Sequence, residues 1–309
     1  MLKYIPFFYK NYCFLVNTLM KTAIFFNSHS GGFRPEYIYK ISDLIYKKSG
    51  KLPEIYTFNS SLKSNKDLDL VYNYDTVFVA GGDGTLKAFA EKLINTEINM
   101  GIIPTGTANV LARELSIPLD PVKAVKLLLK GKSEKIDVGI ANKRLFLSMV
   151  SCGIDAKAVK DVNPKAKEII GSAAYVIEGI GSLITYKPSE VKITIDDNVF
   201  ETKAYVVVIA NTKKYGTGVD LATNADITDG VLDVCIFQKP VLENFGFLLS
   251  VAKTVSGLQI EDKNIIYKKG KNIIVEANPP AATQVDGDKF DYTPLYVDCI
   301  NRALKVLIP

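Results

Sequence analysis

The sequence has few of the residues that cross-link small secreted proteins or build zinc sites. Its four cysteines, Cys13, Cys152, Cys235 and Cys299, lie far apart, and no C-x-x-C pair occurs. In a chain of 309 residues this spacing indicates buried thiols in a reducing compartment, and it argues against a disulfide framework or a zinc site. A chain of this length buries most of its apolar surface without such cross-links.

Long apolar runs and a strong charge of one sign are also missing. No stretch approaches the roughly 18 consecutive apolar residues of a membrane-spanning helix, so none is predicted. The 38 basic residues exceed the 33 acidic ones by only five, which permits attraction to phosphates or an anionic membrane but argues against a nucleic-acid binder. Hydrophobic residues at 48% and charged residues at 23% are ordinary globular values, which exclude disordered, collagen-like and coiled-coil chains.

The first 19 residues, MLKYIPFFYKNYCFLVNTL, are aromatic and apolar but are interrupted at Lys10 and Asn11. No small-residue cleavage site follows them, which argues against a secretory signal. Met20 stands directly before an apolar strand pattern, KTAIFFN. We therefore interpret 1–19 as a mis-assigned start or a loose extension, with an interfacial membrane contact as the alternative.

Residues 20–133 alternate short apolar strands with helices, which predicts an α/β domain with a largely parallel sheet covered on both faces. A length of 309 residues favours about two domains. We expect strands at 21–27, 51–58, 75–80 and 99–104, and helices at 35–50, 85–95, 108–116 and 122–130.

Residues 134–299 show strands separated by polar turns, which predicts an antiparallel β-sandwich or barrel with two inserted helices. The terminal segment 300–309 ends in a short apolar strand that can return to either domain. We take a return to the first domain as the working hypothesis. We expect strands at 135–141, 144–151, 191–197, 198–211, 231–237, 264–269 and 271–277, a hairpin tip at 196–198, and helices at 165–185 and 241–256.

The strongest local signal is the loop Gly81-Gly82-Asp83-Gly84-Thr85, which follows a buried strand and opens a helix. Glycine lets the backbone approach a ligand, and the amides of such a loop and helix N-terminus suit a phosphate. Asp83 is itself repelled by phosphate, so a carboxylate here fits an intervening Mg²⁺ or a protonated donor. A purely structural strand-to-helix turn is the alternative.

Two more polar loops follow strands. The segment 104–109, PTGTAN, offers Thr107 and Asn109 as donors to a phosphate or ribose, and Arg113 lies one turn into the next helix. The segment 27–32, NSHSGG, follows the first strand. Ligands bind at the carboxyl ends of the strands in open α/β sheets, so we expect the three loops to form one crevice.

In this order the motifs resemble the diacylglycerol kinase catalytic domain family, which includes sphingosine kinases and bacterial lipid kinases. The resemblance extends over 20–309. Gly-Gly-Asp-Gly-Thr alone is shared with NAD kinases, so the ordered set is the specific part. Its members are Asn27-x-x-Ser30-Gly31-Gly32, Gly81–Thr85, Pro104–Asn109 with Ala112-Arg113, Asp137, Phe146–Asp155, Ala210-Asn211, Tyr215-Gly216, Ala225–Asp233 and Val285-Asp286-Gly287-Asp288.

The resemblance implies a phosphofructokinase-like α/β domain followed by a β-sandwich, with ATP and a lipid meeting between them. It implies Asp288 as the base for the acceptor hydroxyl and Asp83 as the holder of a catalytic Mg²⁺ through water. It also implies a structural Mg²⁺ on Asp226, Asp229 and the Val231 carbonyl, although the spacing alone suits an Asp-rich turn equally well. The expected nucleotide contacts are Asn27, Ser30, Gly31, Thr57, Gly81, Gly82, Asp83, Gly84, Thr85, Thr107 and Asn109.

The chain departs from the family pattern at two positions. Val110 stands where relatives commonly have an Asp that joins the Asp83 network, which leaves Asp83 with fewer expected partners. Asp288 stands where the usual base is Glu, and it is one methylene shorter. A misplacement of about 1 Å can cost on the order of 10²-fold in rate, so either the site has adjusted or the enzyme is slow or differs in substrate.

The sequence thus predicts a bacterial ATP-dependent lipid kinase of phospholipid biosynthesis that phosphorylates a hydroxyl of diacylglycerol or a related lipid. We expect it in the cytoplasm, held peripherally at the inner membrane surface, with no nucleic-acid partner; a homodimer is left open. One alternative is an NAD kinase-like phosphotransferase, against which 104–113 and 226–233 argue. The other is a non-catalytic lipid-binding regulator with the same fold, supported only by Val110 and Asp288.

Overall fold

A computed structural model of the chain describes residues 21–58, 68–153, 156, 187–216, 219–238 and 265–309. The extension 1–19 and the two helices expected at 165–185 and 241–256 lie outside the described residues. Internal contacts divide the chain into two units. The first runs to Ile136 and takes in Arg302–Pro309, and the second comprises Asp137–Asn301.

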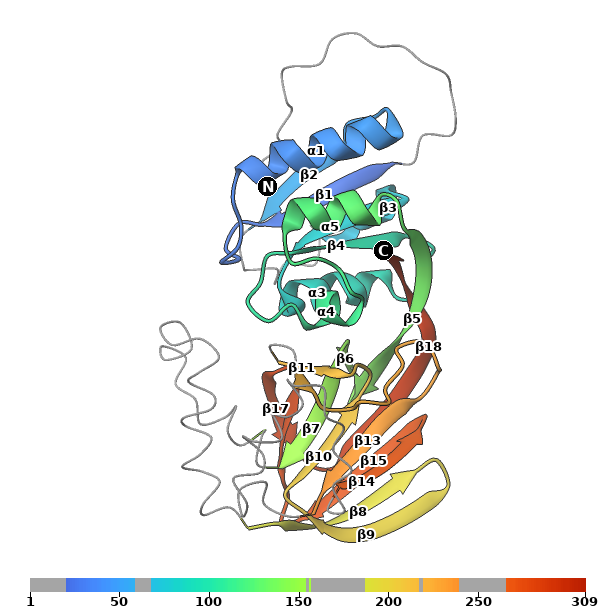
Figure 1. Cartoon of the computed structure of the whole chain (residues 1–309). Coiled ribbons are helices and arrows are strands. Elements are labelled where there is room, and N and C mark those ends of the chain that lie inside the picture. The colour runs from blue at the N-terminus through green and yellow to red at the C-terminus, as the bar shows by residue number, and fades with distance from the viewer. Residues whose placement is uncertain (1–20, 59–67, 154–155, 157–186, 217–218, 239–264) are drawn as a thin grey trace. The chain divides into compact units, whose positions relative to one another are not determined.

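The first unit is built on a parallel sheet with the strand order β2–β1–β3–β4 (Figure 1). Every residue of β3 and β4 is buried, which explains their continuous apolar sequences. The end of the last strand pairs in parallel with β4, with Val306 opposite Met100. The strands are β1 (Thr22–Asn27), β2 (Glu54–Phe58), β3 (Thr76–Gly81) and β4 (Asn99–Pro104).

Helices cover both faces of this sheet. The connections β1–α1–β2 and β3–α3–β4 run in opposite directions along the sheet, so right-handed crossovers place α1 and α3 on opposite faces (Figure 1). Helix α5 packs against α1 and β4, and Asp120 caps it by accepting from Lys123 N at 2.8 Å. The helices are α1 (Glu36–Ser49), the 3₁₀ helix η1 (Asp69–Asn73), α3 (Asp83–Leu93), α4 (Val110–Glu114) and α5 (Pro121–Leu128).

The second unit is an antiparallel β-sandwich, as predicted. One sheet has the order β18–β15–β8–β9 with β5 and β6 at its side, and the other has the order β14–β13–β10–β7–β16–β17. The inner faces of both sheets supply one core, which contains Phe146, Ile193, Ile209, Val234 and Val275. The short strands β11 (Lys214–Tyr215) and β12 (Val219–Asp220) pair with each other and form a separate two-stranded sheet.

The strands of the first of these sheets are β5 (Lys132–Ala141), β6 (Arg144–Phe146), β8 (Ser189–Ile195), β9 (Asn198–Ala204), β15 (Asn272–Asn278) and β18 (Leu295–Ile308). Those of the second are β7 (Met149–Gly153), β10 (Val206–Ala210), β13 (Leu232–Phe237), β14 (Ile265–Gly270), β16 (Ala282–Val285) and β17 (Asp288–Tyr292). The expected hairpin tip is confirmed, because β8 and β9 pair up to Ile195 opposite Asn198 and Asp196 has a φ of 50°.

Two segments expected as single strands are each divided between the two sheets. The segment 144–151 breaks into β6 and β7 because the N–H groups at the junction bond to a distant carboxylate, that of Asp286. The segment 198–211 breaks at Tyr205, whose N–H bonds the carbonyl of Phe237, and gives β9 and β10. A continuous alternating pattern therefore predicted the strand residues correctly but not the change of sheet.

Candidate active site

The three polar loops of the first unit follow β1, β3 and β4, so they meet at the carboxyl edge of the parallel sheet. Side chains join them directly. Asn27 Nδ2 donates to Thr85 Oγ1 at 3.0 Å, and Ser30 Oγ donates to Thr105 Oγ1 at 2.7 Å. The N–H of Gly32 donates to the Thr105 carbonyl at 2.9 Å. The structure therefore brings the three loops together as the sequence predicted.

Glycine is required where these loops cross. A Cβ atom on Gly106 would lie 2.4 Å from the Cα of Gly82, and one on Gly32 would lie 2.9 Å from the Thr105 carbonyl oxygen. Real Cβ contacts essentially never come within 3.0 Å, so a side chain at either position would force backbone to move. The sequence suggested that glycine admits a ligand, and the structure adds that Gly82 and Gly106 let two loops pack against each other.

Asp83 is the first residue of α3 and is half-buried. Its Oδ1 accepts from the N–H of Leu111 at 3.3 Å, at the start of α4. The neighbouring Val110, where the family resemblance led us to expect an Asp, is buried. Asp83 therefore reaches the second loop through a backbone amide instead of a side chain at position 110.

Among the other predicted nucleotide contacts at this edge, some polar side chains are bonded within the protein and others are exposed. Asn109 is 5% exposed, and its amide group bonds the Gly106 N–H at 2.9 Å and the Gly106 carbonyl at 2.8 Å. Its side chain shapes the loop, whereas Thr107 at the same loop is exposed. Thr57 lies half-buried near the end of β2, and Arg113 Nε bonds the Ala108 carbonyl at 2.9 Å.

In the second unit, the carboxylate of Asp286 binds the junction between β6 and β7. Its Oδ2 accepts from Leu147 N at 3.0 Å, and its Oδ1 accepts from Ser148 N at 2.9 Å and Met149 N at 3.1 Å. Asp286 and Gly287 have φ angles of 49° and 81°, the left-handed region that favours glycine and tolerates aspartate. The tight turn was predicted, but the anchoring role of Asp286 was not, since its partners lie 137 to 139 positions away.

The same turn is also held by the buried side chain of Gln284. Gln284 Oε1 accepts from Gly287 N at 2.7 Å, and Gln284 Nε2 donates to Ser151 Oγ at 2.8 Å. Asp288 then begins β17 with its side chain 51% exposed, and its Oδ2 accepts from Arg144 Nη2 at 3.0 Å. No local sequence pattern identifies Arg144, because only the sandwich topology brings it beside Asp288.

The predicted metal ligands Asp226, Asp229 and Val231 lie in one turn ahead of β13. Asp226 Oδ1 accepts from Thr228 N at 2.9 Å and from Thr228 Oγ1 at 2.7 Å, and the hydroxyl bond holds the pKa of Asp226 below its usual value. Asp229 Oδ1 accepts from the Val231 N–H at 3.2 Å. Two carboxylates and a carbonyl are hard oxygen donors, so the donor chemistry fits Mg²⁺.

A lysine competes with a cation at this turn. Lys269 Nζ donates to Asp229 Oδ2 at 2.8 Å and to the Asn224 carbonyl at 2.9 Å, and it lies 3.4 Å from Asp233 Oδ2. Within the described part of the chain, no three His, Cys, Asp or Glu side chains are grouped as metal ligands. The ammonium of Lys269, paired with Asp229, therefore weakens any cation site here.

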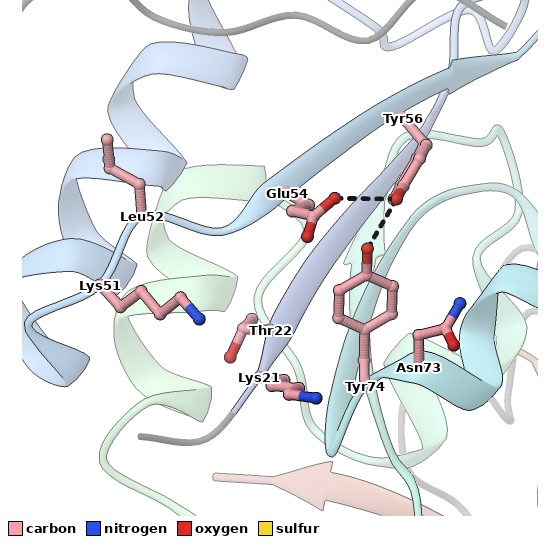
Figure 2. Close-up of a pocket in the computed structure, with 8 residues that line it drawn as sticks. All are labelled: Lys21, Thr22, Lys51, Leu52, Glu54, Tyr56, Asn73 and Tyr74. Carbon is pink, nitrogen blue, oxygen red and sulfur yellow. Dashed lines mark hydrogen bonds between the residues drawn. The ribbon is translucent and has the colours of Figure 1, made fainter. Parts of the chain in front are cut away.

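A cavity of about 270 Å³ opens at the opposite edge of the parallel sheet, near the amino ends of β1 and β2 (Figure 2). Its polar centre is a bonded cluster in which Tyr56 OH donates to Glu54 Oε2 at 3.0 Å and shares a 2.6 Å hydrogen bond with Tyr74 OH. The phosphate-type loops lie at the carboxyl ends of the same strands, so the cavity is not part of their site. Its lining residues are Lys21, Thr22, Lys51, Leu52, Glu54, Tyr56, Asn73 and Tyr74.

Both units match protein-family models. The diacylglycerol kinase catalytic domain matches residues 21–141, and the YegS C-terminal NAD kinase beta sandwich-like domain matches 148–308. The chain is 31% identical over 244 residues to a diacylglycerol kinase of Staphylococcus saprophyticus, covering 78% of this chain and 79% of that one. It is 29% identical over 239 residues to one of Bacillus subtilis, covering 76% and 78%.

A solved structure shares the fold. The crystal structure of a diacylglycerol kinase from Bacillus anthracis aligns with a TM-score of 0.75 at 23% identity. The alignment covers 95% of this chain and 99% of that one, so the likeness includes both the α/β unit and the β-sandwich.

Proposed function

This chain belongs to the diacylglycerol kinase catalytic domain family of lipid kinases, and from that premise we propose that it transfers the γ-phosphoryl group of ATP to a hydroxyl of diacylglycerol or a closely related lipid. Membership of the family and the use of ATP follow from the matches. The acceptor, the metal and the role of each residue are the proposal.

The observation that carries the proposal is the union of three polar loops at the carboxyl edge of one parallel sheet. Loop amides and the N-terminus of α3 favour a phosphate chain, and Asp83 at that helix start is suited to hold a catalytic Mg²⁺ through water. In phosphoryl transfer, positioning and neutralisation of charge supply most of the catalysis. The proposed nucleotide contacts are Asn27, Ser30, Gly31, Thr57, Gly81, Gly82, Asp83, Gly84, Thr85, Thr107 and Asn109.

The second unit contributes Asp288 to the proposal. The acceptor hydroxyl oxygen forms a bond to the γ-phosphorus while the bond from that phosphorus to the β–γ bridging oxygen breaks, and ADP leaves. The hydroxyl proton passes to the Asp288 carboxylate, which is exposed enough to meet a substrate. Its well-anchored turn supports this role, because a base must be held within hydrogen-bond reach of its proton.

The proposal includes a structural Mg²⁺ held by Asp226, Asp229 and the Val231 carbonyl. Bound there, the cation supplies positive charge that holds the turn before β13. The oxygen donor set supports it, and the pairing of Asp229 with Lys269 limits its strength.

We also propose that contact with the membrane is peripheral. None of the helices among the described residues is long and apolar enough to cross a bilayer. With a net charge of +5, the chain is expected to leave anionic vesicles as salt is raised. Retention on vesicles until detergent is added would contradict this and favour 1–19 as an anchor.

The direct test is label transfer by the purified full chain. The assay uses γ-labelled ATP, Mg²⁺ and diacylglycerol in mixed micelles, with NAD in a parallel tube. We expect labelled phosphatidic acid from wild type and a loss on the order of 10²-fold or more in Asp83→Ala. Label in NAD instead would support the NAD kinase alternative, and no ATP consumption with a total lipid extract would support the non-catalytic one.

A further inference from the structure

Asp288, the proposed base, has a side chain one methylene shorter than glutamate. This side chain is half exposed at the start of β17. We infer that Arg144 is the positioning residue that fixes the Asp288 carboxylate in the direction of the acceptor hydroxyl. The inference rests on the proposed function, because the direction of this carboxylate matters to turnover only if it takes the acceptor proton.

The guanidinium of Arg144 contacts three successive residues of β17. Its Nη2 donates to Asp288 Oδ2 at 3.0 Å, and its Nη1 donates to the Lys289 carbonyl at 3.4 Å. Its central carbon lies 5.6 Å from the centroid of the Phe290 ring. A planar guanidinium that bonds through two nitrogens and stacks on an aromatic ring has a defined direction, which a lysine ammonium lacks.

The backbone beneath Arg144 is also fixed. Arg144 follows the two-residue turn of the β5–β6 hairpin, in which Asn142 and Lys143 have φ angles of 44° and 70°. Asn142 Oδ1 accepts from Tyr296 N at 2.7 Å, and Asn142 N donates to the Tyr296 carbonyl at 2.9 Å. Asn142 Nδ2 also donates to the Pro294 carbonyl at 3.1 Å. The turn that presents Arg144 is therefore bound to the segment that follows β17.

On the other side of the pair, the backbone of Asp288 is held by the Asp286–Gly287 turn and its hydrogen bonds. The bond to Arg144 restricts the side-chain rotamer of Asp288. An ionised carboxylate accepts up to about four hydrogen bonds, so the pair with Arg144 leaves it able to receive a hydroxyl proton. By restricting the rotamer, Arg144 would hold the shorter Asp288 carboxylate within hydrogen-bond reach of the acceptor hydroxyl.

The pair is not expected to matter much for folding. The side chains of Arg144 and Asp288 are 34% and 51% exposed, and exposed ion pairs add little stability. Loss of the guanidinium should therefore lower turnover while leaving the unfolding midpoint and nucleotide binding close to wild type.

The experiment is a double-mutant cycle in the full chain, with diacylglycerol in mixed micelles as acceptor. We expect Arg144→Ala to lower kcat about 10- to 10²-fold, with the KM for ATP changed less than about twofold. Arg144→Lys should recover part of the lost turnover, because lysine keeps the positive charge but lacks the planar, two-nitrogen geometry of the guanidinium. In an Asp288→Asn background, Arg144→Ala should have no further effect. Lys143→Gln, which removes the neighbouring exposed charge, should behave as wild type.

The outcomes separate the two levels of the proposal. If wild type phosphorylates no lipid, the proposed function itself fails. If wild type is active and Asp288→Asn loses turnover on the order of 10²-fold, but Arg144→Ala has a wild-type kcat, only the positioning role fails. Equal losses from Arg144→Ala in both backgrounds would show that Arg144 acts independently of Asp288. Should Arg144→Ala unfold in urea earlier than wild type, a wild-type kcat for the folded Arg144→Lys would overturn the inference instead.

Discussion

The two candidate regions of this molecule are held in place by different forces. At the carboxyl edge of the parallel sheet, the loops pack backbone against backbone, and glycines at positions 82 and 106 make the approach possible. In the β-sandwich, the turn that carries Asp288 is held by side chains: the Asp286 carboxylate binds the distant β6–β7 junction, and the Gln284 amide binds the turn itself. The first region should therefore be sensitive to added volume, and the second to the removal of a hydrogen-bond acceptor.

The largest effect is expected from Asp286→Ala. It leaves the N–H groups of Leu147, Ser148 and Met149 buried without their carboxylate partner. Each such group costs about 1–3 kcal/mol, so we expect the free energy of unfolding to fall by roughly 3 kcal/mol or more. Urea unfolding measures it, with Asp288→Ala as a matched control that should cost less than about 1 kcal/mol. Equal midpoints for the two variants would contradict the anchoring role.

A smaller loss is expected from Gly106→Ala. The added methyl group would lie 2.4 Å from the Gly82 backbone, and overpacking of this kind costs about 1–3 kcal/mol. We also expect weaker binding of ATP, since the loops must separate to admit the methyl group. Gly84→Ala is the control for stability, because nothing lies within 4 Å of its added carbon and the residue is helical. If both variants unfold at the same urea concentration, loop packing is not what requires glycine at 106.

The sequence predicted the first region better than the second, and the physical reason is the range of the contacts. Alternating strands and helices imply a parallel sheet, and a parallel sheet places the ends of its strands, and hence the three loops, at one edge. Nothing local predicts that Asp286 binds amides 137 to 139 positions away, or that Arg144 meets Asp288. The division of 144–151 and 198–211 between two sheets was missed for the same reason.

The three polar loops lie together as predicted, but the use of each residue in them depends on geometry. Asn109 was predicted as a ligand donor, and its amide group is bonded to Gly106. A polar loop residue can contact a ligand or support the loop, and the sequence pattern is the same in both cases. Only the positions of the neighbouring backbone atoms separate them.

Cysteine labelling gives a more sensitive measure of packing in the sandwich. Burial raises the pKa of Cys235 and Cys299 to about 12, so both thiols are protonated at neutral pH and should react slowly with iodoacetamide. Peptide mapping by mass spectrometry should find them protected in wild type and labelled faster in Asp286→Ala. Unchanged protection in that variant would place the effect of Asp286 outside the sandwich core.

The smallest effect is expected on removal of Mg²⁺. Lys269 already neutralises Asp229, so chelation should lower the Tm by only about 2–4 °C, the shift that corresponds to roughly 1 kcal/mol in a chain of this size. Elemental analysis should find the metal in wild type and less of it in Asp226→Ala. Equal metal content in the two proteins would remove these residues as its ligands.

If the first unit binds the nucleotide and Asp288 of the second acts on the acceptor, nucleotide binding and turnover should separate in a variant of Asp288. The most direct measurement is turnover with diacylglycerol set beside equilibrium ATP binding in Asp288→Asn. The predicted result is a loss of label transfer on the order of 10²-fold or more with nearly unchanged ATP affinity, because the ground-state nucleotide does not need this group. Label transfer at the wild-type rate, or ATP affinity lost together with turnover, would contradict the division of roles.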